Sequence, residues 1–139
     1  CSNFIGDTID MVRTCGFRAM LLTGHVGKMI KLSGGIMNTH SKEGDCRMEL
    51  LAAAALYAGG DAKVARNLLE AVTTEEGVRI LCEADCLHHV MDRVMERILF
   101  YLRKRAGENL QIECMMYATE YGLLAQSEGA EALLQELKG

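Results

Sequence analysis

Thr23-Gly24-His25-Val26-Gly27-Lys28 connects an apolar run, residues 17–22, to the helix-like spacing of Val26, Met29 and Ile30. A near-continuous apolar run is typical of a parallel strand that is buried on both faces. The pattern therefore predicts a strand, a glycine turn and a helix in direct succession. Such a junction presents backbone N–H groups and the positive end of a helix to an anion.

A helix is expected before this junction. Ile5, Ile9 and Val12 are spaced to share one helical face, and Gly16 is suited to the left-handed position that ends a helix. Residues 1–40 thus have the order helix, strand, turn, helix. This order is characteristic of α/β proteins.

The middle of the chain is expected to be helical, with the remaining strands near its end. The helical segments are 47–57, 62–72, 74–82 and 87–106, followed by strands at 110–117 and 122–125 and a terminal helix at 130–137. Asp61 and either Thr73 or Thr74 are placed to cap two of the helices. We therefore expect one domain, residues 1–139, of the α/β class: a layered sheet flanked by helices, with a helix-rich middle and strands near both ends.

Charge and hydropathy limit the classes of function. A net charge of −4 argues against nucleic acid as a partner, because nucleic-acid-binding domains usually carry a clustered basic surface. No apolar run approaches the roughly 20 residues of a membrane span, and no secretory leader is seen. The six cysteines include no CxxC pair, which favours free, mostly buried thiols in a reducing cytoplasm. Because the chain starts at Cys1 and enters a helical pattern at once, we expect it to be part of a longer protein.

The strand-to-helix junction is also where charged and reactive side chains are most concentrated. It is not a P-loop, because Leu22 stands where a glycine is needed and Met29 where serine or threonine is needed. It also lacks the third glycine of a dinucleotide fingerprint. We expect the following side chains to meet at the carboxyl end of the strand, where α/β proteins bind ligands: His25, Lys28, Lys31, Asn38, Thr39, His40 and Ser41. The alternative is a tight strand-to-helix turn with exposed lysines.

Three other clusters have simpler interpretations. Cys82, Cys86 and His89 would share one face of a continuous helix and could bind a metal. An expected helix break near Asp85 and the lack of an evident fourth ligand instead favour core thiols beside a histidine, and no metal site is assigned. The charges within 92–97 are interpreted as an exposed helix face with local ion pairs. The basic run 103–105 is explained by the dipole at a helix carboxyl end.

Several segments, namely residues 2–6, 21–28, 31–41 and 45–49, carry a resemblance to a known family. The chain resembles the carboxyl-terminal part of the cobalt-precorrin-5B (C1)-methyltransferases, the CbiD family. The resemblance is dense over residues 2–55 and less diagnostic beyond them. Family members have a large amino-terminal part that this chain lacks.

The resemblance implies a methyltransferase of anaerobic cobalamin (vitamin B12) biosynthesis. The methyl group would pass from S-adenosylmethionine, the implied cofactor, to carbon 1 of a cobalt-corrinoid substrate, giving cobalt-precorrin-6A. The fragment alone is expected to be inactive, because its site would be shared with the missing part. Self-association is left open. The motif positions that carry over are Gly24, His25, Gly27, Lys28, Lys31, Asn38, Thr39, His40, Ser41, Asp45, Arg47 and Glu49.

We assign roles to these positions from their chemistry. Lys28, Lys31 and Arg47 are expected to pair with carboxylates of the substrate. His25 or His40 is expected to be catalytic, as a base near neutral pH or in contact with cobalt. The other positions are expected to bind or orient substrate or cofactor: Gly24, Gly27, Asn38, Thr39, Ser41, Asp45 and Glu49. The competing hypothesis is a non-catalytic α/β module that binds an anionic metabolite or another protein.

Overall fold

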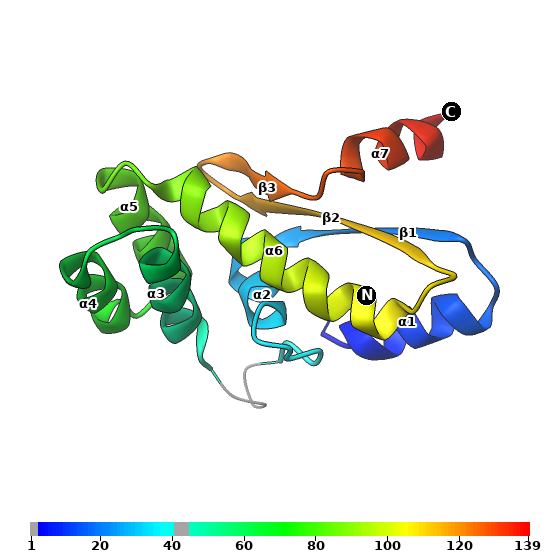
Figure 1. The fold of residues 1–139 in the computed structure, drawn as a ribbon, viewed down its shortest axis with the longest axis horizontal. Helices are drawn as coiled ribbons and strands as arrows, with labels where there is room; N and C mark the ends of the chain where they lie inside the picture. The colour runs from blue at the N-terminus through cyan, green and yellow to red at the C-terminus, as the bar shows by residue number, and fades with distance from the viewer. Residues whose placement is uncertain (1–2, 41–44) are drawn as a thin grey trace.

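A three-stranded mixed sheet lies at the centre of the protein (Figure 1). The computed structural model describes residues 3–40 and 45–139. The strands lie side by side in the order β1 (Ala19–His25), β2 (Gln111–Ala118) and β3 (Gly122–Gln126). β1 is parallel to β2, and β2 is antiparallel to β3. Because Ala19 pairs with Gln111, segments far apart in the sequence form the parallel part of the sheet.

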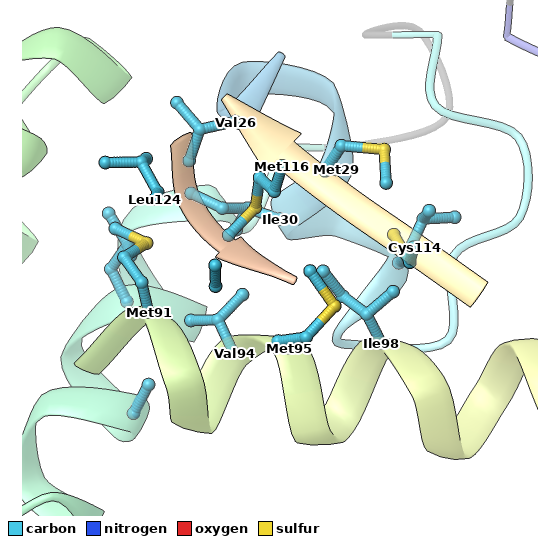
Figure 2. Close-up of a cluster of buried hydrophobic side chains, with 14 of the residues drawn as sticks. Val26, Met29, Ile30, Met91, Val94, Met95, Ile98, Cys114, Met116 and Leu124 are labelled. Atoms are coloured by element: carbon cyan, nitrogen blue, oxygen red, sulfur yellow. The ribbon is translucent and has the colours of Figure 1, made fainter. Parts of the chain in front are cut away.

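The 20-residue helix α6 (Leu87–Ala106) crosses one face of the sheet and buries the main core (Figure 2). Its apolar residues recur at helical spacing, and Val94 and Ile98 are at most 1% exposed. They pack together with Met116 of β2 and with the short helix α2 (Val26–Leu32). Within the described ranges, none of the helices has the length and apolar character of a membrane-spanning segment.

Three further helices form a group beside α6, at the end of the molecule away from α1 (Figure 1). They are α3 (Arg47–Tyr57), α4 (Ala62–Glu70) and α5 (Thr74–Glu83). The Asp61 carboxylate caps α4 by accepting the Val64 N–H at 2.9 Å. The Thr73 hydroxyl caps α5 by accepting the Glu76 N–H at 3.2 Å. Both predicted caps are confirmed.

The first and last helices attach at different faces. α1 (Ile5–Thr14) packs against α6, and the Arg105 guanidinium of α6 lies 2.7 Å from the Asp10 carboxylate. Ile5 is buried, as its helical spacing predicts. α7 (Ala130–Lys138) packs on β1 and β2 from the side of the sheet away from α6 (Figure 1). The sheet therefore has helices on both faces, and the predicted α/β class is confirmed.

Two predicted boundaries are wrong. The strand expected at 17–22 begins at Ala19 and runs on to His25, and Phe17 is 62% exposed. The reason is that β1 is held by pairing with β2, and this pairing begins only at Ala19. The helix expected to reach Val72 ends at Glu70, and Val72 is 77% exposed.

The cysteines are free but less buried than expected. Of those in the described ranges, only Cys114 is buried, and burial raises the pKa of its thiol to about 12. Cys15 and Cys82 are exposed, while the other two are intermediate. The expectation of mostly buried thiols is therefore wrong for the described residues. Cys1 lies outside them.

Candidate functional site

The predicted glycine turn does not exist, because β1 passes directly into α2. Gly24 is paired within the sheet opposite Met116, and His25 is the last strand residue. A Cβ on Gly24 would lie only 2.8 Å from the sulfur of Met29. Gly24 is thus required by close packing of α2 on β1, and not by a loop that cradles an anion.

His25 caps α2 with its ring. The Gly27 N–H donates to Nδ1 of His25 at 3.0 Å. Because the donor is a backbone amide, Nδ1 must be unprotonated, and the neutral ring then carries its proton on Nε2. The ring therefore already occupies one of the helix amides that were expected to bind an anion. It presents an N–H group, and not a basic nitrogen, to the remaining space.

A groove of about 390 Å³ lies beside the carboxyl end of β1. We call it the β1 groove, and its polar lining comes from Thr23, His25, Lys28 and Thr39. Lys28 is exposed and His25 is half-buried. The structure thus brings together Gly24, His25, Lys28 and Thr39 of the predicted site residues.

Lys31 does not line this groove, although it lies on the same helix as Lys28. Its side chain is only 3% exposed, and its ammonium donates to the backbone carbonyl of Thr39 at 3.2 Å. Thr39 is in turn anchored to Asn3, whose carbonyl accepts the Thr39 N–H at 2.9 Å. This chain of contacts fixes the segment after α2 against the start of α1. In the described structure, Lys31 therefore holds the scaffold and is not placed to meet a substrate carboxylate.

Asn38 and His40 lie further along this segment. The Asn38 side-chain oxygen accepts the His40 N–H at 3.1 Å, which is a local turn contact. His40 is exposed and is not among the residues that line the β1 groove. The predicted meeting of His40 with His25 in one cavity is therefore not seen. Ser41 lies outside the described residues.

Asp45 and Arg47 form a bidentate ion pair at the start of α3. Nε of Arg47 lies 2.9 Å from one carboxylate oxygen of Asp45, and Nη2 lies 3.1 Å from the other. The hydrogen bonds from Arg47 lower the pKa of Asp45 to about 2. Nη1 of Arg47 donates to the buried hydroxyl of Thr74, at 3.3 Å. The planar fork that was expected to bind a substrate carboxylate is thus engaged within the protein. Glu49 is exposed on the first turn of α3.

His25 also lines a second cavity, which has a volume of about 180 Å³. We call it the acidic pocket, because Glu75 and Glu120 line it together with Tyr121. The sequence analysis missed it. Glu75 lies in the first turn of α5, and Glu120 lies in the tight turn between β2 and β3. No local pattern indicates that these two positions meet at the same edge of the sheet.

The expected helix break near Asp85 separates Cys82 from Cys86 and His89, so these three residues do not share one helical face. Cys82 belongs to α5, whereas Cys86 precedes α6, and the chain turns between them at Asp85, whose φ is +57°. The positive φ breaks the helical continuity that the spacing assumed. Across the described ranges, no group of three or more His, Cys, Asp or Glu side chains is arranged to hold a metal ion.

The charged face of α6 also differs from expectation. Arg93 forms the expected local ion pair with Glu96, at 3.3 Å, but its guanidinium also stacks on the ring of Tyr57, 3.5 Å from its centroid. Arg97 donates to the hydroxyl of Tyr101, at 3.1 Å. The local-pair interpretation is therefore correct for Arg93, while aromatic rings from two helices organise this face.

The run at 103–105 does more than complement the helix dipole. Arg105 pairs with Asp10 of α1, and Arg103 lies 3.5 Å from the carboxylate of Glu113 in β2. Both partners are distant in sequence, so the spacing of the basic residues could not indicate them.

Comparison with known proteins gives a consistent picture. A family model described as "CbiD, C-terminal domain" matches residues 38–128. A curated relative from Ruminiclostridium cellulolyticum, named cobalt-precorrin-5B C(1)-methyltransferase, is 40% identical over 117 residues, which are 84% of this chain and 30% of that protein. Proteins of the same name from Alkaliphilus metalliredigens and Methanocaldococcus jannaschii are 34% and 38% identical, over 99% and 83% of this chain and 36% and 32% of their own lengths. The chain thus spans about a third of the length of these curated relatives. No solved structure matches it.

Proposed function

Because the chain belongs to the family of CbiD carboxyl-terminal domains, we propose that it forms part of a cobalt-precorrin-5B C(1)-methyltransferase. The observation that carries this proposal is that relatives of this name align with 83% or more of the chain. The proposed reaction methylates carbon 1 of a cobalt-corrin precursor to give cobalt-precorrin-6A, a step of anaerobic cobalamin biosynthesis. The proposed methyl donor is S-adenosylmethionine. In this reading, the chain alone is inactive and supplies one part of the site.

We propose the β1 groove as the place where the corrin periphery is bound. The proposed substrate carries carboxylates, which need cationic partners. Lys28 presents an exposed ammonium in this groove. His25 adds an N–H donor at Nε2, because Nδ1 is engaged by Gly27. In this proposal His25 orients a substrate oxygen by hydrogen bonding. This role replaces the base that sequence chemistry suggested, since Nε2 already carries the proton of the neutral ring.

The remaining predicted residues have two proposed roles. Gly24, Gly27, Lys31, Asn38 and Thr39 shape and hold the wall of the groove through the contacts described above. The other motif positions remain proposed as contacts to substrate or cofactor: His40, Ser41, Asp45, Arg47 and Glu49. Positioning by such a rigid wall is the main help that methyl transfer needs, since donor and acceptor must be aligned.

The acidic pocket fits the charge of the proposed donor. When bound, S-adenosylmethionine supplies an electrophilic methyl group, whose bond to the positively charged sulfur breaks as the bond to carbon forms. Glu75 and Glu120 would favour that cationic end, whereas Lys28 lines the β1 groove and not this pocket. At about 180 Å³ the pocket is smaller than common sites for whole ligands, which are roughly 300–1,000 Å³, so it suits only part of the donor.

Methylation of cobalt-precorrin-5B by a full-length protein that contains this chain tests the proposal. We expect Lys28→Ala to lower kcat/KM about tenfold to a hundredfold, because a charge-assisted contact to the substrate is lost. The melting temperature should stay nearly unchanged, since Lys28 is exposed. Lys63→Ala, at an exposed position of α4, is the matched control.

Two results would contradict the proposal. The first is a full-length protein that binds the corrinoid but transfers no methyl group, which would indicate a binding module. The second concerns Lys28 alone: equal losses of activity and of melting temperature would assign it a structural role in place of substrate binding.

A further inference from the structure

A further groove lies between α3 and α6, next to the end of α2 that is opposite His25. It has a volume of about 320 Å³, which is within the range of sites for small ligands. The Ser33–Gly34 turn at the end of α2 contributes to its lining. We call it the α3–α6 groove.

The floor of this groove is apolar because α3 is rich in alanine. Leu50, Ala53 and Ala54 line it from α3, and Val94 lines it from α6. Alanine side chains are too short to fill the space between the helices, so a hollow remains there. A floor of this kind favours an apolar body over a fully hydrated ion such as free phosphate.

The walls are cationic, and aromatic rings hold them. The Arg93 guanidinium lies 3.5 Å from the centroid of the Tyr57 ring, while that of Arg97 lies 5.2 Å from the Tyr101 ring. A cation–π contact uses the flat face of the guanidinium and leaves most N–H groups at its edge available. Within the described ranges, Arg97 donates only to the Tyr101 hydroxyl and to no carboxylate. It therefore keeps donors for a carboxylate from outside.

The spacing of the two arginines gives an independent reason to expect an anion. Arg93 and Arg97 are four residues apart on α6, so their side chains are neighbours on the helix surface. Like charges at this spacing repel and destabilise a helix. Arg93 has one partial compensation, the largely exposed Glu96. An anion bound between the two guanidinium groups would remove the repulsion.

We propose that the α3–α6 groove binds a carboxylate carried on an apolar body, with Arg93 and Arg97 holding the carboxylate and the alanine floor holding the body. A corrinoid has this chemistry, because carboxylate arms surround an apolar macrocycle. The identity of the occupant rests on the proposed function: the two arginines take one carboxylate arm of the corrin substrate, and the alanine floor contacts the adjoining edge of its macrocycle. None of the residues that line this groove lines the β1 groove.

Calorimetric titration of the chain tests this inference without an activity assay. The probes are dicyanocobyrinic acid, a cobalt corrinoid with free carboxylates, and its neutral methyl ester. We expect the acid to bind more tightly than the ester. The double variant Arg93→Gln/Arg97→Gln should weaken binding of the acid about tenfold and leave that of the ester unchanged. Its melting temperature should fall only slightly, because relief of the repulsion offsets part of the lost contacts of Arg93 with Tyr57 and of Arg97 with Tyr101. Arg66→Gln, at an exposed position of α4, should behave as wild type.

Other outcomes separate this inference from the proposed function. Acid binding that depends on Lys28 and not on the two arginines would overturn the inference and leave the β1 groove as the substrate site. Acid and ester binding with equal affinity would also overturn it. Glutarate, a small dicarboxylate, tests whether the groove binds a carboxylate that is not attached to a corrin ring. Arginine-dependent binding of glutarate without corrinoid binding would retain a carboxylate site but overturn the corrinoid occupant. Failure of the wild-type full-length protein to methylate its substrate bears on the proposed function alone.

Discussion

The two lysines of α2 show how one short helix serves a ligand on one side and the scaffold on the other. Lys28 is exposed at the β1 groove, whereas Lys31, less than one turn further along, is 3% exposed and bonded to the Thr39 carbonyl. Both are lysines in one motif, and sequence chemistry gives them the same role. The difference teaches that a charged side chain is available to a ligand only where it is not already buried and bonded to another part of the protein.

Replacing each lysine by methionine tests this contrast most strongly. We expect Lys31→Met to lower the free energy of unfolding by about 2–3 kcal/mol, because the buried Thr39 carbonyl loses its charged donor. Lys28→Met should change it by less than about 0.5 kcal/mol, as is usual for an exposed position. Urea unfolding of both variants provides the measurement. Similar losses of stability for the two variants would show that the two lysines do not differ in their structural roles.

Gly24 tests whether the junction is a packed strand or a ligand loop. Gly24→Ala should cost about 1–2 kcal/mol, because the new methyl group would force the Met29 side chain to move. Gly24→Ala/Met29→Leu should recover part of the loss by removing the close sulfur. Thermal unfolding of the single and double variants gives the answer. A single variant as stable as wild type would show that Gly24 is not constrained by packing.

His25 combines both roles, and two substitutions separate them. His25→Ala removes the helix cap and should cost about 1 kcal/mol of stability. His25→Asn should retain most of that stability, because asparagine is a good capping residue, while the Nε2 donor is lost. We expect both variants to lower methylation by a full-length protein that contains this chain. Activity retained in His25→Asn would limit His25 to the cap.

The smallest expected effect is the pH dependence of the stability that the Asp45 carboxylate contributes. Its pKa is about 2 in the folded protein, below the ordinary 3.8, because Arg47 donates hydrogen bonds to it. A depressed folded-state pKa contributes stability above the unfolded value, and this contribution is lost as the pH falls towards 2. Since the Asp45 side chain is 52% exposed, the contribution should be only about 0.5 kcal/mol.

Comparing wild type with Asp45→Asn at about pH 5 and about pH 2.5 measures this contribution. The difference in unfolding free energy between the two proteins should be present at the higher pH and shrink at the lower one. A difference that does not change with pH would show that the Arg47 contact, and not the charge of Asp45, accounts for it.

The fold was largely predictable because its signals are local. The caps at Asp61 and Thr73, the spacing of α6 and the closing strands all depend on neighbours within a few residues. The α/β class follows from the order of these elements. The exact start of β1 was not predictable, because it depends on where β2 pairs with it.

The candidate site was predictable only in part. His25, Lys28 and the carboxyl end of β1 were found correctly as one location, since their proximity is local. The burial of Lys31 depends on the segment after α2 folding back to Asn3. The stacking of Arg93 on Tyr57 joins two helices, and the acidic pocket joins α5 to the β2–β3 turn. Such contacts between elements distant in sequence leave no periodic pattern in a single chain.

The parallel pairing of β1 with β2 also has a consequence for how the protein folds. β1 lies near the start of the chain, and its neighbour in the sheet is synthesised only after α2 to α6. Local helices form quickly, whereas pairing across so long a connection must wait for loop closure. We therefore expect the edge that carries His25 and Lys28 to assemble late, after the helical layer. Substitutions in that layer should slow refolding, while those in β1 should mainly speed unfolding.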